Sequence, residues 1–178
     1  MCALDAPFFM GGKTVNKVIR LKKRRAAALI FIVGTVLLTA FIWLHSLMPA
    51  TISAQESGNV LSVAEMLLRA LNLNPQLNDF IIRKAAHFSE FLALGVMVTS
   101  SFKLYYGSIK KYVFHILFTL LMIPVADESL QYLSPGRSAQ VSDILLDLSG
   151  CITGMLLTCA AALLIHKVRK NRKERIMR

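Results

Sequence analysis

Residues 26–48 read AAALIFIVGTVLLTAFIWLHSLM, an apolar stretch without a single Asp, Glu, Lys or Arg. As a helix it would be about 34 Å long, enough to cross a hydrocarbon core of about 30 Å. A cleaved signal peptide is the competing interpretation, because a basic segment precedes the stretch and TISA (51–54) follows it. The apolar region of a signal peptide is only about 7–15 residues long, so the sequence favours a retained membrane anchor.

Three more apolar blocks follow, at residues 84–102, 112–132 and 141–165. Apolar residues make up 55% of the 178-residue chain, and the charged 17% lie mostly between the blocks. This composition is typical of membrane proteins. The sequence therefore predicts an all-α, polytopic membrane protein, with four transmembrane helices in residues 26–165 and basic tails at 1–25 and 166–178.

The positive charges indicate how these helices are oriented. The net charge is +11, but 14 of the 21 Lys and Arg lie in residues 13–25 and 167–178, which carry no nucleic-acid-binding motif. The loop at 103–111 has three more, whereas the loops at 49–78 and 134–140 have one each. By the positive-inside rule, both termini and the 103–111 loop are cytoplasmic and the other loops face outward. We expect a multi-pass protein of the bacterial cytoplasmic (inner) membrane, with no nucleic-acid partner.

The first outer loop contains a signal for a helix of its own. Ser62 and Glu65 have the spacing of a capping box, and an apolar stripe follows until Asn74-Pro75. We expect a short interfacial helix on the outer membrane surface. The three cysteines, Cys2, Cys151 and Cys159, show neither metal-ligand spacing nor a disulfide framework.

Polar residues inside the predicted spans are the candidates for function, because ionisable groups there usually face a bundle interior or a water-filled cavity. Counted from the cytoplasmic ends, His87 and Asp127 each lie about 24 Å along their helices, and Asp147 lies about 30 Å along its own. Three helices thus bring polar groups to one level near the outer surface. The candidate residues are Arg83, Lys84, His87, Glu90, Asp127, Glu128, Gln131, Arg137, Asp143 and Asp147.

These residue types suit several kinds of chemistry. His87 with Glu90 could act as an oriented general base, and Arg83 or Arg137 could hold a phosphate or carboxylate. Alternatively, His87 and several carboxylates could bind a divalent metal. The structural alternative is a network that only holds helices together, as polar residues commonly do in membranes. The remaining histidines, His45, His115 and His166, lie near span ends and are expected at the interface.

Small residues in the last span offer a packing surface. Gly150 and Gly154 form a GxxxG pattern on the same stripe as Asp143 and Asp147. Such a pattern lets another helix approach closely, either from a second copy of the chain or from within it. The sequence therefore leaves the oligomeric state open.

Two segments resemble the signatures of a known family. FIIRKAAHFSEFLALG (80–95) is similar to the first signature of the VanZ-like family, and DESLQYLSPGR (127–137), followed by Asp143 and DLSG (147–150), is similar to the second. The first span matches more loosely, through His45-Ser46 and residues 55–57. The resemblance implies a bacterial four-span membrane protein associated with resistance to the glycopeptide teicoplanin, through an activity that is not established. It also implies that Asn is accepted at position 147, which argues against Asp147 as an essential proton carrier.

The leading hypothesis is an envelope-facing protein that binds, or binds and modifies, an anionic lipid-linked molecule. Its partners would be membrane lipids and a lipid-linked envelope precursor or a lipoglycopeptide. An accessory subunit of a membrane complex and a proton-coupled transporter are the alternatives. An enzyme would use His87, Glu90, Asp127 and Glu128 as catalytic groups and Arg83, Gln131, Arg137 and Asp143 for substrate binding. The sequence specifies neither a cofactor nor a metal.

Overall fold

The chain is helical throughout the part that the structure describes. The computed structural model describes residues 8–49, 51, 52, 55, 58, 62, 66 and 78–177. Its elements are α1 (Phe8–Ser46), α3 (Asp79–Tyr106), a 3₁₀ turn η1 (Lys110–Tyr112), α4 (Val113–Tyr132) and α5 (Val141–Ile176). No strand occurs in these residues, so the predicted all-α class is confirmed. The predicted interfacial helix at 62–73 lies outside the described residues, apart from Ser62 and Met66.

Three of the helices are long and apolar enough to cross a membrane: α1 over Thr14–Ser46, η1 with α4 over Lys110–Tyr132, and α5 over Val141–Arg172. The helix α3 does not meet the same criterion of apolarity, although its 28 residues would span about 42 Å. Its first turns contain Arg83, Lys84, His87 and Glu90. The structure therefore supports three of the four predicted spans directly.

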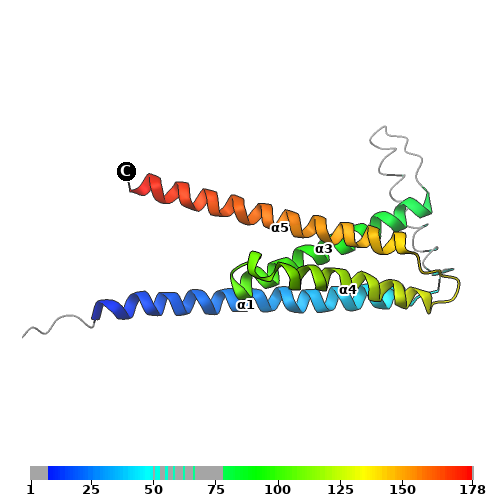
Figure 1. Ribbon diagram of the computed structural model, residues 1–178, viewed down its shortest axis with the longest axis horizontal. Helices are drawn as coiled ribbons and strands as arrows, with labels where there is room; N and C mark the ends of the chain where they lie inside the picture. Colours follow the sequence, from blue (N-terminus) through cyan, green and yellow to red (C-terminus); the bar gives the residue numbers. More distant parts are fainter. Residues whose placement is uncertain are drawn as a thin grey trace, which may run out of the picture.

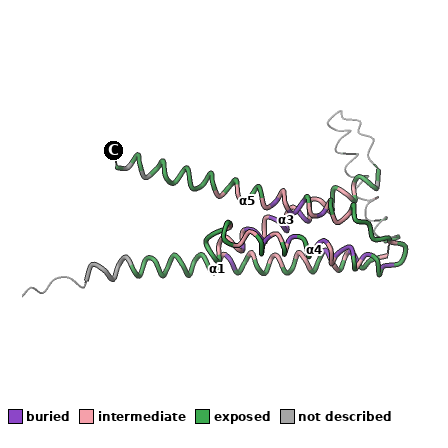
Figure 2. The backbone as a smooth tube through the Cα atoms, in the orientation of Figure 1, coloured by how far each residue is buried: buried purple, intermediate pink, exposed green. Residues whose placement is uncertain are grey.

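Both basic tails continue the neighbouring helices. Residues 14–25 are exposed residues of α1, and most of residues 166–176 are exposed residues of α5. The two extensions project from the same end of the bundle, where α5 diverges from the other helices (Figure 1). The buried residues lie toward the opposite end (Figure 2).

The helix α3 packs against both α1 and α5 and lies centrally in the bundle. Its buried residues Phe91, Leu94 and Val98 form a core with residues from each of the other helices: Ile42, Ile116, Leu120 and Cys151. Phe91, Leu94 and Val98 stand at i, i+3 and i+7, so they form one buried apolar stripe of α3 that continues from the face of His87.

Glycines set the close crossing of α3 and α5. A Cβ added to Gly154 would lie 2.1 Å from the Leu92 carbonyl oxygen, and one added to Gly95 would lie 2.1 Å from that of Cys151. A Cβ on Gly150 would lie 2.6 Å from the Phe88 carbonyl oxygen. These distances are far shorter than van der Waals contact, so only glycine fits. The predicted GxxxG stripe thus packs within the chain.

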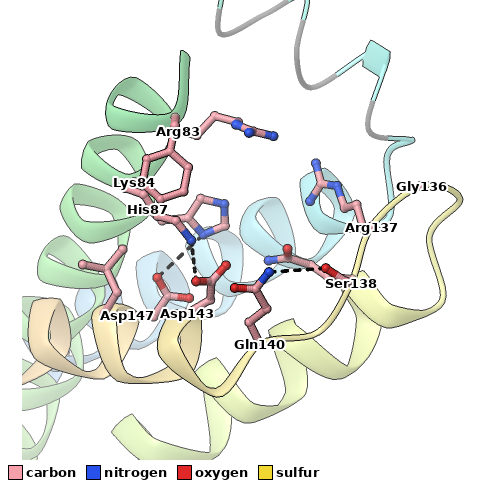
Figure 3. A pocket seen from close by; sticks show the side chains of 12 residues that line it. Arg83, Lys84, His87, Gly136, Arg137, Ser138, Gln140, Asp143 and Asp147 are labelled. Carbon is pink, nitrogen blue, oxygen red and sulfur yellow. Dashed lines mark hydrogen bonds and ion pairs between the residues drawn. The ribbon is translucent and has the colours of Figure 1, made fainter. Parts of the chain in front are cut away.

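The ends of α3 and the α4–α5 connection have defined caps and turns. The Asn78 side chain accepts a hydrogen bond from Ile81 N at 2.9 Å and caps the start of α3. Gly107, with φ of 83°, ends α3 in the left-handed conformation. Gly136, with φ of 76°, makes the turn between α4 and α5. This turn places Arg137 on the α4–α5 connection, across the cavity from Arg83 of α3 (Figure 3).

Candidate functional site

A polar cavity of about 210 Å³ lies at the end of the bundle where α3 and α5 begin and α4 ends. Its walls come from α3, the end of α4, the α4–α5 connection and α5 (Figure 3). The lining residues are Phe80, Arg83, Lys84, His87, Gln131, Gly136, Arg137, Ser138, Gln140, Asp143, Leu146 and Asp147. Phe80 and Leu146 are the apolar side chains in this lining, and Gly136 has no side chain. The other nine lining residues are polar or charged.

His87 and Asp147 face each other across the α3–α5 contact. His87 Nδ1 lies 3.7 Å from Asp147 Oδ1, and the imidazole stacks on Phe91 with ring centroids 6.4 Å apart. The Asp147 residue is only 1% exposed, and neither of its carboxylate oxygens accepts a hydrogen bond from the described residues. A buried carboxylate without hydrogen bonds is costly, which marks Asp147 as a residue that needs a functional explanation.

Asp127 is fully buried and held from two helices. Ser46 Oγ of α1 donates a hydrogen bond of 2.6 Å to Asp127 Oδ1, and Gln131 Nε2 donates one of 2.9 Å to Oδ2. Ser134 Oγ in turn donates to the Ser46 carbonyl oxygen at 2.9 Å. The side chain of Asp127 is therefore oriented by its neighbours, with one ligand atom within 4.8 Å of those of His87 and Asp147.

Two further carboxylates have partners of their own. Glu128 Oε1 accepts a hydrogen bond of 2.5 Å from the backbone N–H of Gln140, which ties α4 to the start of α5. Asp143 of α5 forms an ion pair with Lys84 of α3 on the cavity wall. These contacts hold the cavity walls together and leave Asp143 electrically compensated.

Arg83 and Arg137 are different, since neither forms an ion pair or a hydrogen bond through its side chain among the described residues. Figure 3 shows the two side chains reaching over the cavity from α3 and from the α4–α5 connection. Burial lowers the pKa of the Arg137 guanidinium, and so does repulsion from Arg83, against attraction from Asp127 and Glu128. An arginine nevertheless stays protonated in proteins, so the cavity has two positive groups that form no ion pair with any described residue.

The structure brings together most of the residues predicted from sequence. Of the eight residues to which the sequence gave a catalytic or substrate-binding role, five line the cavity: Arg83, His87, Gln131, Arg137 and Asp143. Asp127 lies close to His87, whereas Glu90 and Glu128 do not line the cavity. The carboxylate nearest to His87 Nδ1 in an ion-pair geometry is Asp147 rather than the expected Glu90. Glu90 is instead close enough to His87 and His45 to interact with both electrostatically.

The sequence placed Asp147 among the candidate residues but gave it no catalytic or binding role. It cited Ser46 only for the loose match of the first span, and Gln140 was not a candidate. A signal for Asp147 existed, because it stands four residues after Asp143 on the same face of its helix. Nothing in the sequence indicated the contacts of Ser46 and Gln140, since each contact depends on how two separate segments of the chain pack together.

Fold and site together define a helical membrane protein with a polar pocket at one end of its bundle. The family model for VanZ/LLP1 matches residues 31–164. The chain therefore belongs to the VanZ/LLP1 family, as its two motifs predicted, and every residue that lines the cavity lies within the matched region. No curated protein and no solved structure matches the chain.

Proposed function

We propose that the cavity binds the anionic headgroup of a lipid or lipid-linked molecule at the outer face of a bacterial cytoplasmic membrane. The observation that carries this proposal is the pair Arg83 and Arg137, which lie over the cavity and form no ion pair with a carboxylate of the described residues. A guanidinium presents its donors in a planar fork that matches a phosphate or a carboxylate. An anion between them would relieve their mutual repulsion.

The dimensions of the cavity support a headgroup rather than a whole lipid. Its volume of about 210 Å³ is smaller than that of typical sites for drug-sized ligands, about 300–1,000 Å³. The side chains of Phe80 and Leu146 add apolar surface to its lining. A phosphate-sized group would bind the arginines while its acyl chains stay in the bilayer.

The proposed topology has α3 as a fourth span, both termini in the cytoplasm and the cavity facing out. It is supported by the basic extensions of α1 and α5, which lie at the opposite end of the bundle from the cavity (Figure 1). Basic flanks favour the cytoplasmic side.

Cysteine labelling in intact cells tests this topology. In a background without the native cysteines, a membrane-impermeant maleimide should label Ser138→Cys directly. It should label Ser108→Cys, in the loop at the other end, only after permeabilisation. The reverse pattern would place the cavity in the cytoplasm and end the proposal.

Binding or modification of such a lipid-linked anion would reduce the access of a lipoglycopeptide such as teicoplanin to its envelope target. In an enzymatic version, His87 would transfer protons, with Glu90, Asp127 and Glu128 as further catalytic groups. Arg83 and Arg137, together with Gln131, would hold the substrate, and Asp143 would position Lys84 on the cavity wall through their ion pair.

The deciding experiment compares cells that express wild type, Arg83→Gln, His87→Ala, Glu90→Gln or Asp127→Asn at equal membrane abundance. Teicoplanin susceptibility and mass spectra of the envelope lipids are measured on the same cultures. Protection and a shifted lipid species in wild type alone would support catalysis. Protection that needs Arg83 but shifts no lipid would support binding. Variants that all protect like wild type would overturn the proposal.

A non-enzymatic accessory subunit is the second candidate function. The observation that favours it is structural: the carboxylates of Asp127 and Glu128 bind groups on other segments of the chain, Ser46 Oγ and Gln140 N. A stoichiometric membrane partner that copurifies with the protein, without any change in lipid composition, would favour this alternative.

A further inference from the structure

The triad of His87, Asp127 and Asp147 has the composition and spacing of a metal-binding site. Each residue offers one ligand atom, and the three atoms all lie within 4.8 Å of one another. The residues come from three different helices, α3, α4 and α5. Imidazole nitrogen and carboxylate oxygen bind Zn²⁺ at about 2.0–2.2 Å, so the three ligand atoms would need to close on the ion by small side-chain movements.

The second observation is the state of Asp147. Its side chain is only 2% exposed, and neither oxygen accepts a hydrogen bond from any described residue. The nearest cationic or potentially cationic group in ion-pair range is His87, at 3.7 Å. A hydrogen-bonded network built only for helix packing would satisfy this carboxylate, whereas a metal ion would use its oxygens as ligands.

The surroundings of Asp127 and His87 also fit a metal-binding site. Ser46 and Gln131 hydrogen-bond the carboxylate of Asp127, and each carboxylate oxygen retains a further lone pair. Phe91 stacks on the His87 ring, with the two ring planes 17° apart. Metal ligands are commonly oriented by such outer contacts.

Charge balance points to a divalent ion. Asp127 and Asp147 together carry two negative charges when ionised, and a protonated His87 would balance only one of them. A divalent ion with neutral His87 would balance both. We infer that His87, Asp127 and Asp147 form a binding site for one divalent transition-metal ion, of the Zn²⁺ or Mn²⁺ class that accepts both nitrogen and oxygen ligands.

The inferred site leaves room for a further ligand. His87 and Asp147 line the cavity, whereas Asp127 does not, so the open side of a bound ion would face the space below Arg83 and Arg137. Three protein ligands and an open position are typical of catalytic rather than structural metal sites. The idea that an anion held by the arginines would reach this ion rests on the proposed function. The metal site itself is independent of that function.

Metal binding can be measured without any lipid substrate. The full-length protein, purified in detergent micelles through an affinity tag without histidine, is stripped with EDTA and titrated with Co²⁺, whose visible absorption reports bound nitrogen and oxygen ligands. Zn²⁺ content after desalting gives the stoichiometry. We expect one ion per chain and a Zn²⁺-dependent rise in the thermal unfolding temperature of wild type, because a ligand that binds only the folded state stabilises it.

Variants identify the ligands. Asp147→Asn and His87→Gln should each weaken the binding of Co²⁺ at least about tenfold. His115→Gln, which changes an exposed histidine of α4, and Glu174→Gln, which changes an exposed carboxylate of α5, should bind like wild type. Arg83→Gln removes an anion contact but no metal ligand, so it separates failure of this inference from failure of the proposed function.

Two results would overturn the inference. One is wild-type protein that retains no ion and whose unfolding temperature does not respond to Zn²⁺. The other is Co²⁺ binding that Asp147→Asn and His87→Gln leave at wild-type strength, which would assign the ion to another site.

Discussion

Ser46, the last residue of α1, donates a hydrogen bond of 2.6 Å to Asp127 of α4, a residue 81 positions further along the chain. Both residues are buried, at 1% and 0% exposure. This bond fixes the end of the first helix to the carboxylate beside the cavity. The position of Asp127 therefore depends on α1, although α1 contributes no residue to the cavity wall.

Replacing Ser46 should accordingly destabilise the protein. Ser46→Ala leaves Asp127 Oδ1 without its donor, and we expect the free energy of unfolding to fall by about 1–3 kcal/mol. Ser129→Ala is the matched control, because the Ser129 hydroxyl is exposed and bonds only the Val125 carbonyl of its own helix. Unfolding in detergent micelles, followed by circular dichroism, measures both. Equal stability of the two variants would contradict a structural role for the Ser46–Asp127 bond.

The crossing of α3 and α5 should not tolerate even one methyl group. Gly154→Ala would place its Cβ 2.1 Å from the Leu92 carbonyl oxygen, so the helices must separate, and we expect a loss of about 1–3 kcal/mol or more. Gly34→Ala in α1 is the control, because its Cβ would meet only the Met97 side chain at 3.5 Å. That variant should gain about 0.5–1 kcal/mol from the helix preference of alanine. Thermal unfolding of the two variants should thus shift in opposite directions.

Arg137 should contribute to anion affinity through both its charge and its shape. Arg137→Gln removes both, and we expect an affinity loss of about tenfold or more for a short-chain phospholipid. Arg137→Lys keeps the charge without the planar fork, so its affinity should be intermediate. Titration with the phospholipid in neutral detergent measures the affinity of wild type, Arg137→Gln and Arg137→Lys. Arg169→Gln, in the exposed extension of α5, should bind like wild type.

Replacing Lys84 and replacing Asp143, which form an ion pair, should change the affinity for the anion in opposite directions. Lys84→Gln would leave the charge of Asp143 uncompensated on the cavity wall, so an incoming anion should bind more weakly. Asp143→Asn would free the charge of Lys84, so the anion should bind more tightly. Both side chains are about one quarter exposed, at 27% and 25%, and their loss should cost at most about 1 kcal/mol of stability. Shifts of the same sign in both variants would show that the pair does not act through charge.

The fold was predictable where one physical rule dominated. Runs of apolar residues fix the helices of a membrane protein, since a backbone in lipid must satisfy its own hydrogen bonds. The level of the polar residues also followed from the 1.5 Å rise per residue, and the structure brings His87, Asp127 and Asp147 together as that count predicted. The helices and the predicted apolar spans do not have the same ends. The first span was predicted to reach Met48, whereas α1 ends at Ser46, and α3 begins at Asp79, five residues before the second apolar block.

Partners across helices were not predictable, because they depend on the rotation of each helix about its axis. Glu90 follows His87 by three residues, so the two side chains are neighbours on any helix, and Glu90 was the expected partner. The packing of α3 against α5 through Gly95, Gly150 and Gly154 turns His87 toward Asp147 instead. Only the packed bundle could show that these glycines serve contacts within the chain rather than between copies.

The cavity draws its walls from α3, the end of α4 and α5, and its buried carboxylate Asp147 belongs to α5, which follows α3 and α4 in the chain. A nascent chain that has inserted α1, α3 and α4 carries His87 and Asp127 but no closed pocket around them. Without α5, the side chains of His87 and Asp127 would therefore lack the wall that Asp143, Leu146 and Asp147 supply.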